Sequence, residues 1–297
     1  MDLRQLRYFV TLAETLHFGR AAERLHITQP PLSRQIAALE EALGTPLFTR
    51  HSRSVALTPA GEHFLEHARR LLSDLELAVH TTRTAAEVSR RELRIGFTMY
   101  AAWNLLPGLV RAHGDAWPDD VLTLDETLPR DLQQALMSGA ADVGISFPLL
   151  VGSSLHYRPL YREPLCAVLP EDHPRADDAR VAVAALADEA FVTFPATTAP
   201  ALHEAVMACC RAARFAPRIR LEAHLQQTIV NLVAEGLGVA LVPDSMRRMR
   251  LPGAVFRPLD ASPTIEQGLY WHPRNANPAL AAFLEGAERF TDTTAPP

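Results

Sequence analysis

The stretch from Phe9 to Gly44 constrains this chain most, because its apolar residues recur at helical spacing in three short segments. The first segment has an apolar face that includes Phe9 and Leu12, and the second is expected to start at Gly19, just after Phe18. The third has one apolar stripe with spacings of four, three and four, formed by Leu32, Ile36, Leu39 and Leu43. We therefore expect three helices, with a tight turn between the second and the third.

The start of the third helix has a clear sequence signal. Thr28 is suited to the N-cap position, where its hydroxyl would accept a hydrogen bond from a free backbone N–H group. Pro30 and Pro31 follow in the first helical turn, where a missing N–H group costs little. These residues predict that the helix begins directly after Thr28.

The face of this third helix opposite the apolar stripe is slim and polar. It is formed by Gln29, Pro30, Ser33, Arg34, Ala37 and Ala38. Small side chains allow close approach to DNA, while amide, hydroxyl and guanidinium groups supply donors for bases and phosphates. The pattern favours a DNA-recognition helix over a solvated helix of an ordinary bundle.

The same stretch resembles the helix-turn-helix domain of the LysR-type transcriptional regulators. The matching segments are LRQLRYFV, RAAERL, QPPLSRQIAALEEALG and PLFTR, in the same order along about the first sixty residues. Gly19 stands where the family usually has Ser or Thr, and glycine is an acceptable N-cap. The resemblance implies a sequence-specific DNA-binding protein that contacts DNA through Thr28, Gln29, Pro30, Pro31, Ser33 and Arg34.

Charge is distributed unevenly along the 297 residues. Residues 1–58 hold seven arginines and five acidic residues, a net charge of +2. Because the net charge of the whole chain is −5, residues 59–297 have a net charge of −7. A slightly basic N-terminal part followed by an acidic remainder is consistent with nucleic-acid contact at one end of the chain.

Several other classes of protein are disfavoured. No apolar run reaches the length of about 20 residues that a membrane-spanning helix needs. The N-terminus has no uninterrupted apolar segment typical of a signal peptide, so we expect a cytoplasmic protein. Cys166, Cys209 and Cys210 lack metal-ligand spacing, and the chain has no phosphate-binding or nucleophile motif of known enzymes. We expect neither enzymatic activity nor a metal or other cofactor.

Residues 48–57 are expected to form two short strands around a polar turn, the wing of a winged helix-turn-helix. Arg50 and Arg53 would lie near its tip, within reach of phosphates or a narrow minor groove. A solvated surface hairpin is the alternative for either arginine.

Thr58 and Pro59 predict the start of a long helix, with Glu62 favourably placed in the first turn. One stripe contains Phe64, Ala68, Leu71, Leu75, Ala78, Thr82 and Ala85, and it is widened by Leu65, Leu72, Val79 and Ala86. So long an apolar stripe beside a small domain favours pairing with the same helix of another subunit. Packing onto its own chain is the alternative. The resemblance implies a homodimer through this helix and, for the family, a homotetramer.

After a polar hinge at 89–92, strands alternate with helices, as in an α/β domain with a largely parallel sheet. Expected strands are Leu93–Phe97, Val121–Leu124, Val143–Ile145, Leu165–Leu169, Phe191–Thr193, Val239–Val242 and Gln267–Trp271. Expected helices are Pro129–Ser138, Ala201–Ala212, Gln226–Ala234 and Pro278–Thr291.

The segments at 136–145 and 232–241 look alike, which indicates two related lobes. The resemblance implies an α/β regulatory domain of the periplasmic-binding-protein type. We accordingly expect three domains: a winged helix-turn-helix at 1–58, a linker helix at 59–88 and the regulatory domain at 89–297. Its first lobe would comprise 92–161 and 268–297, and its second lobe 162–267.

Ligands of open α/β sheets bind beyond the carboxyl ends of the strands. The loops expected there supply Thr98, Met99, Tyr100, Thr127 and Pro129 from one lobe and Ala196, Thr197, Thr198, Gln226 and Gln227 from the other. Their hydroxyl and amide groups suit a small polar or carboxylated effector, and Tyr100 and Trp103 are expected to stack on a ring.

The sequence resembles in particular the LysR-type regulators of aromatic-compound degradation, which respond to muconate-like or benzoate-like acids. LRQLRYFV, QPPLSRQI and LVAEGLGVALVPDS carry this similarity. Tyr100 and Pro129 stand where that branch has a serine and a threonine, so a hydroxyl is lost or moved at each position.

The expected function is that of a transcriptional regulator, an activator or a repressor, that binds promoter DNA and is switched by a small aromatic or dicarboxylic acid. The alternatives are a redox-sensing or ligand-independent regulator of the same family, or a solute-binding module. A membrane partner is not expected.

Overall fold

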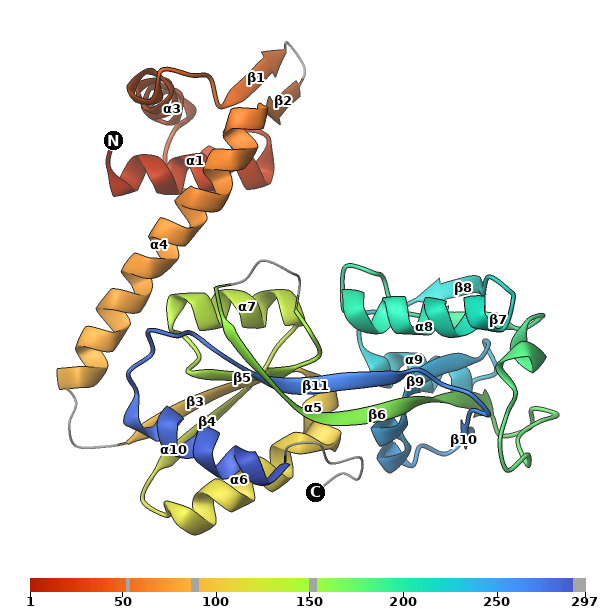
Figure 1. Ribbon diagram of the computed structural model, residues 1–297. Helices are drawn as coiled ribbons and strands as arrows, with labels where there is room; N and C mark the ends of the chain where they lie inside the picture. Colours follow the sequence, from red (N-terminus) through yellow and green to blue (C-terminus); the bar gives the residue numbers. More distant parts are fainter. Residues whose placement is uncertain (52–53, 87–90, 150–153, 291–297) are drawn as a thin grey trace. The chain divides into compact units, whose positions relative to one another are not determined.

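The computed structural model describes residues 1–51, 54–86, 91–149 and 154–290. The chain divides into two compact units, Met1–Thr82 and Arg83–Pro297 (Figure 1). The first is a small helical unit with a two-stranded hairpin, and the second is an α/β unit.

The first unit has its elements in the predicted order: α1 (Leu3–Thr15), α2 (Phe18–Arg24), α3 (Gln29–Leu43), β1 (Phe48–His51), β2 (Ser54–Leu57) and α4 (Pro59–Ala86). The predicted stripe of α3 packs inward, since Leu32, Ile36 and Leu39 are fully buried. The ring of Phe9 in α1 packs between those of Phe48 and Phe64, at centroid distances of 5.4 and 5.1 Å. One apolar core therefore joins α1, α3, the hairpin and the start of α4.

Two helix starts differ in detail from the prediction. Helix α2 begins at Phe18, and the Nδ1 atom of His17, not Gly19, caps it by accepting a hydrogen bond from the backbone N–H of Arg20. Thr28 does occupy the N-cap position of α3, but its side chain forms no capping hydrogen bond. The reason is local: a capping side chain bonds the second or third N–H group of the helix, and those positions are Pro30 and Pro31.

The hairpin and the start of α4 agree with the prediction. Strands β1 and β2 are antiparallel, with Arg50 opposite Val55. The hydroxyl of Thr58 accepts the backbone N–H of Gly61 at 2.9 Å and thus caps α4. A Cβ atom at Gly61 would lie only 2.1 Å from the carbonyl oxygen of Leu47, so this contact between α4 and the hairpin requires glycine.

The second unit has two lobes joined by two long antiparallel strands, β6 (His156–Pro170) and β11 (Thr264–Trp271). The first lobe contains β3 (Glu92–Phe97), α5 (Met99–Trp103), α6 (Leu105–Ala116), β4 (Val121–Glu126), α7 (Pro129–Ser138), β5 (Val143–Ser146), α10 (Pro278–Gly286) and η3 (Ala287–Phe290). The second contains η1 (Val183–Leu186), β7 (Ala190–Thr193), α8 (Pro200–Ala212), β8 (Arg218–Glu222), α9 (Gln226–Ala234), β9 (Ala240–Pro243), η2 (Asp244–Met249) and β10 (Ala254–Pro258).

The sheet order is β10-β6-β11-β5-β3-β4, with β9 also paired to β6, and β7 pairs with β8 in a separate small sheet. Strands β3, β4 and β5 are parallel neighbours, whereas β11 enters antiparallel to β5. Figure 1 shows β6 and β11 running side by side from one lobe into the other. The register of this pair shifts between Gln267 and Gly268, which marks an irregularity within the crossing.

Several predicted elements need correction. The segment expected as a loop at 98–103 contains the short helix α5, and the predicted strand Leu165–Leu169 is only the end of the longer β6. Helix α6 and strands β8 and β10 were not predicted. Helices α7 and α9 have the predicted bounds.

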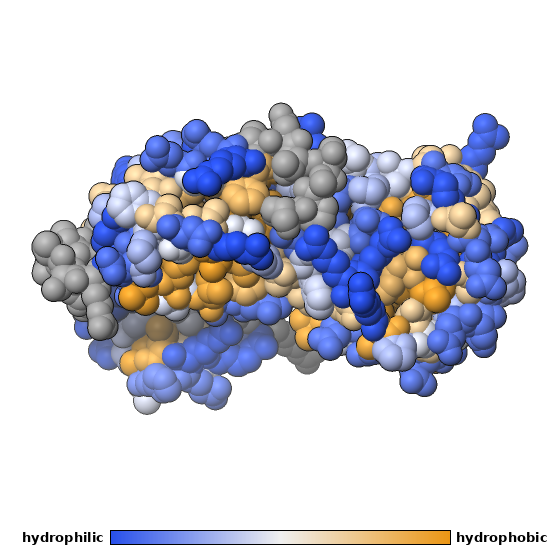
Figure 2. Space-filling model, turned by 90° about the horizontal axis from the view of Figure 1, so that it is seen from below, coloured by the Kyte–Doolittle hydropathy of each residue, from blue (hydrophilic) through white to orange (hydrophobic). Residues whose placement is uncertain are grey.

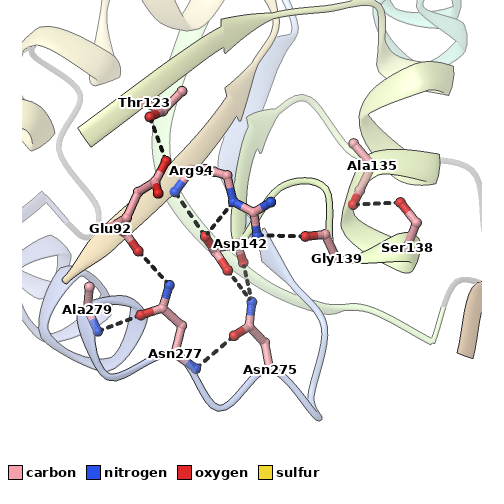
Figure 3. Close-up of polar contacts among 10 residues, drawn as sticks. All are labelled: Glu92, Arg94, Thr123, Ala135, Ser138, Gly139, Asp142, Asn275, Asn277 and Ala279. Carbon is pink, nitrogen blue, oxygen red and sulfur yellow. Dashed lines mark hydrogen bonds and ion pairs between the residues drawn. The ribbon is translucent and has the colours of Figure 1, made fainter. Parts of the chain in front are cut away.

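A polar network fixes the starting edge of the first lobe (Figure 3). The buried carboxylate of Asp142 accepts the backbone N–H of Arg94 at 2.9 Å, forms an ion pair with the Arg94 guanidinium at 3.4 Å and accepts the Asn275 amide at 3.0 Å. The Asn277 amide donates to the carbonyl of Glu92 at 2.8 Å, and its oxygen caps α10. The late segment before α10 is thereby attached to the first strand of the lobe.

No helix in the described ranges is long and apolar enough to span a membrane. On the face seen in Figure 2, hydrophobic residues reach the surface in separate patches among hydrophilic ones.

Candidate functional site

The predicted DNA-binding residues of α3 share the side of that helix turned away from the core. Gln29, Pro30 and Arg34 are exposed, and Ser33 is half-buried. Within the described part of the chain, Arg34 has no ion pair, and it is the only basic residue of α3. Its guanidinium is therefore available for a phosphate or a base edge.

Other arginines of the first unit are already engaged. Arg24 and Arg69 both lie close to the Glu14 carboxylate, at 3.6 and 3.2 Å, and Arg20 donates to the carbonyl of Thr15 at 2.7 Å. Within this unit, Arg34 contrasts with them by combining exposure with a free guanidinium group.

The two wing arginines cannot be placed to the same extent. Arg50 lies in β1, but only its backbone is described, and Arg53 lies outside the described residues. Their predicted contact with DNA remains a prediction.

The predicted effector residues of the first lobe gather at the carboxyl ends of β3 and β4, which are parallel neighbours. The backbone N–H of Thr98 donates to the carbonyl of Ile145 at 3.0 Å, and that of Thr127 donates to the carbonyl of Phe97 at 2.9 Å. Met99 opens α5 and Pro129 opens α7, so two helices start at this edge. The structure thus places these residues at one edge of the sheet, and their contact with an effector stays a prediction.

Tyr100 has a different environment from the one predicted. Its ring is buried, lies 4.7 Å from that of Phe147 and belongs to the apolar core of the second lobe. Trp103 also packs against that core. The Tyr100 ring therefore lacks the free face expected for stacking on an effector, whereas Trp103 is half-buried.

In the second lobe, the predicted residues lie on two neighbouring segments. The Thr198 hydroxyl is 2.8 Å from Nδ1 of His224, two residues before Gln226 opens α9. Ala196, Thr197 and Gln227 are exposed. Gln226 is buried at the start of α9.

Tyr100 and Gln226 are the predicted effector residues that meet across the lobes. Burial raises the pKa of the Tyr100 phenol, and the nearby Gln226 amide partly opposes this effect. The tyrosine is therefore neutral at physiological pH, and the Gln226 amide beside it is hydrogen-bonded to its phenol.

Sequence reasoning missed a buried polar cluster centred on Glu163 of β6. One carboxylate oxygen accepts from the Asn104 amide at 2.9 Å, the Gln267 amide at 3.0 Å and the Ser245 hydroxyl at 3.1 Å, while the other accepts the Ser245 backbone N–H at 2.6 Å. Burial raises the pKa of Glu163 to about 7. Next to this cluster, a cavity of about 610 Å³ is lined by Tyr161, Pro164, Asp244, Ser245, Arg247, Arg248 and Arg250, and by none of the predicted effector residues.

The chain matches two family models that together span most of its length. Residues 3–62 match the bacterial regulatory helix-turn-helix protein, lysR family, and residues 86–290 match the LysR substrate binding domain. The chain belongs to the LysR family of transcriptional regulators. It is thus a DNA-binding regulator with an effector-binding domain and not an enzyme.

Individual relatives extend over nearly the whole chain. The transcriptional regulator IlvR of Caulobacter vibrioides is 41% identical over 96% of this chain and 96% of its own. CatR of Pseudomonas putida is 41% identical over 84% of each chain. The crystal structure of full-length CbnR complexed with its target DNA matches with a TM-score of 0.63 and 27% identity, covering 98% of this chain and 100% of CbnR.

Proposed function

We propose that this LysR-family regulator recognises promoter DNA through the exposed face of α3, with Arg34 as its principal contact. The free guanidinium of Arg34 opposite the buried stripe of Leu32, Ile36 and Leu39 carries this proposal. Thr28, Gln29, Pro30, Pro31 and Ser33 complete the contact surface, and Arg50 and Arg53 of the wing extend it. The similarity to a regulator crystallised on its target DNA supports the same interpretation.

A DNase footprint on the DNA flanking this protein's own gene tests the proposal. Arg34→Ala should abolish specific protection at physiological salt while the oligomer stays intact. The matched control is Arg111→Ala, because Arg111 is exposed on α6 in the other unit. Unchanged protection by Arg34→Ala would refute the assignment.

The second part of the proposal concerns the effector, a small carboxylated molecule bound where the two lobes face each other. Thr98, Met99 and Thr127 with Pro129, and Ala196 to Thr198 with Gln226 and Gln227, would form its surroundings. Support comes from the N-termini of α7 and α9, which begin at Pro129 and Gln226 and whose free backbone N–H groups suit an anion. Effector binding favours the closed arrangement of the lobes and so changes how paired DNA-binding units hold the promoter.

Benzoate and cis,cis-muconate are suitable probes for this part. In the same footprint, one of them should shorten or shift the protected region, and Thr98→Ala or Thr197→Ala should reduce that response without weakening DNA binding. If both variants respond with the dose dependence of the wild type, the assigned residues are wrong. Protection that ignores both compounds would remove the aromatic-acid class and leave the regulator.

The oligomer forms, in this proposal, through α4. Leu71 and Val79 are apolar yet 48% and 44% exposed on that helix, whereas Ala68 of the same helix is buried in the core of its own unit. A second copy of α4 would cover them, and a tetramer would follow from further contacts between regulatory domains. Leu71→Glu combined with Val79→Glu should lower the molecular mass seen by analytical ultracentrifugation; an unchanged mass would exclude this interface.

A redox-sensing regulator has less support. Cys166, Cys209 and Cys210 are all buried, and burial raises the pKa of each thiol, which disfavours the reactive thiolate. We place the regulator in the cytoplasm, where bacterial promoter DNA is found.

A further inference from the structure

The Glu163 carboxylate connects the parts of the second unit that must move if the lobes change their relative orientation. Glu163 itself and Gln267 lie on the two crossing strands, β6 and β11. Asn104 stands between α5 and α6 of the first lobe, and Ser245 belongs to η2 of the second. Glu163, which is only 1% exposed, is thus hydrogen-bonded to both lobes and to the other crossing strand.

The donors around Glu163 are fixed in direction. The Asn104 amide must donate with its nitrogen, because its oxygen accepts the backbone N–H of Leu105 at 2.5 Å. The Ser245 backbone N–H can only donate. These groups stabilise an ionised carboxylate, whereas burial favours the neutral acid. Burial is the larger effect, and the donors limit it, so that the pKa of Glu163 is raised only to about 7.

The cluster can also satisfy the protonated acid. The Ser245 hydroxyl, 3.1 Å away, can accept a proton as well as donate one. The Gln267 oxygen is buried and has no partner within the described chain, so a turn of that amide presents a second acceptor. Both charge states of Glu163 can therefore be accommodated at this contact between the two lobes, the lobe junction, with different hydrogen bonds in each state.

The other titratable and charged groups that face Glu163 lie on α5, β6 and η2. Burial raises the pKa of Tyr100 on α5 and of Tyr161 and Cys166 on β6 above their usual values, so all three stay neutral. On η2, Asp244 pairs with Arg247 at 3.4 Å, and its negative charge adds to the rise at Glu163. Arg248 donates to the carbonyl of Trp103 at 2.8 Å and so forms a second link between η2 and α5.

We propose that Glu163 is a pH-sensitive positioning residue of the lobe junction: loss of its proton favours separation of the junction and weakens the effector-bound, closed arrangement. A separated junction exposes the carboxylate to water, where its ionised form is no longer penalised. By linkage, the buried arrangement is therefore favoured below neutral pH, and its stability relative to the separated arrangement falls as the pH rises. The junction half of this proposal, the pH-dependent separation of the lobe junction, is argued from the Glu163 cluster itself. The effector half, the weaker effector binding that follows from separation, rests on the proposed function.

Hydrogen exchange of the full-length protein, without effector or DNA, tests the junction half. After correction for intrinsic rates, peptides covering 99–105 and 244–250 should lose about tenfold protection between pH 6 and pH 8, given a folded pKa of about 7 and a reference value of 4.5. Glu163→Gln, a neutral isostere, should remain protected at both pH values. Glu285→Gln, at an exposed glutamate of α10, should behave as the wild type.

A second variant separates titration from simple loss of packing. Ser245→Ala removes one hydrogen bond that favours the ionised form, so the midpoint of the exchange transition should move to higher pH. A wild type without pH dependence, or a Glu163→Gln protein with the wild-type dependence, would overturn the junction half. An unchanged midpoint in Ser245→Ala would do the same.

The effector half has its own readout. Whichever probe acid gives a footprint response should bind the wild type more tightly at pH 6 than at pH 8, and Glu163→Gln should abolish that difference. A pH-dependent junction with pH-independent effector affinity would refute the coupling to the effector site. If neither probe acid elicits a response, the failure lies with the proposed effector class, and the exchange experiment still decides the junction half.

Discussion

Tyr100 and Phe147 follow two neighbouring parallel strands of the first lobe, yet their rings, 4.7 Å apart, are buried in the core of the second lobe. Helix α5 therefore packs against both lobes, with Ala101 in the core of the first and Tyr100 in the core of the second. The sequence suggested an aromatic residue at the effector, whereas the side chain serves to attach one lobe to the other.

This attachment makes Tyr100 important for stability. Tyr100→Ala should lower the free energy of unfolding of the second unit by about 3–5 kcal/mol, the range seen when a large buried ring is truncated. Tyr100→Phe keeps the ring and should cost far less. Urea denaturation of both variants measures the difference, and equal losses would show that the hydroxyl rather than the ring matters.

The contact of α4 with the hairpin depends on Gly61. Gly61→Ala places a methyl group against the Leu47 carbonyl and should destabilise the first unit and weaken DNA binding. Gly114→Ala on α6 is the matched control, because no other atom lies within 4 Å of its new methyl group. That control should be neutral or stabilising by up to about 1 kcal/mol in thermal unfolding. A tolerated Gly61→Ala would mean that the hairpin can shift away from α4.

The network at the starting edge of the first lobe gives a third prediction. Asp142→Asn removes the charge that pairs with Arg94 and should cost about 2–4 kcal/mol, since the partly buried guanidinium loses its counter-charge and keeps its hydrogen bond to the Gly139 carbonyl. Asp119→Asn, at an exposed aspartate before β4, should change stability by less than about 0.5 kcal/mol. Chemical denaturation at pH 7 compares the two variants; similar losses would argue against a structural role for the Asp142 network.

The raised pKa of Glu163 predicts how stability depends on pH. Between the reference value of 4.5 and about 7, the folded chain holds a proton that the unfolded chain has released, so the contribution of this group to stability falls as the pH rises. The full change is on the order of 3 kcal/mol. Denaturation curves from pH 4.5 to 8 should show this slope in the wild type and lack it in Glu163→Gln. A parallel slope in that variant would assign it to another group.

Elements whose apolar spacing is regular were predictable from the sequence. The stripe of Leu32, Ile36 and Leu39 fixed the orientation of α3, and α7 and α9 were found with their bounds. Strand β6 was recognised only at its end because Pro159 and Pro164 interrupt the earlier part, although the strand tolerates Pro159 at the register shift opposite Gly268.

The Glu163 cluster was beyond sequence reasoning. Its partners lie 59, 82 and 104 positions away along the chain, so no local pattern connects them. The missing cap at Thr28 illustrates the opposite case: Pro30 and Pro31 were visible from the start, and their lack of N–H groups already excluded the expected hydrogen bond.

The return of the chain through β11 to α10 makes the second lobe an insertion within the first. A chimera that exchanges the segment between β6 and β11 with that of a relative would leave the starting edge held by Asp142, Asn275 and Asn277 untouched. Truncation before α10 would instead damage the first lobe, although it removes only the last part of the sequence. The residues of the second lobe can thus be exchanged as one continuous segment, while the first lobe keeps its framework.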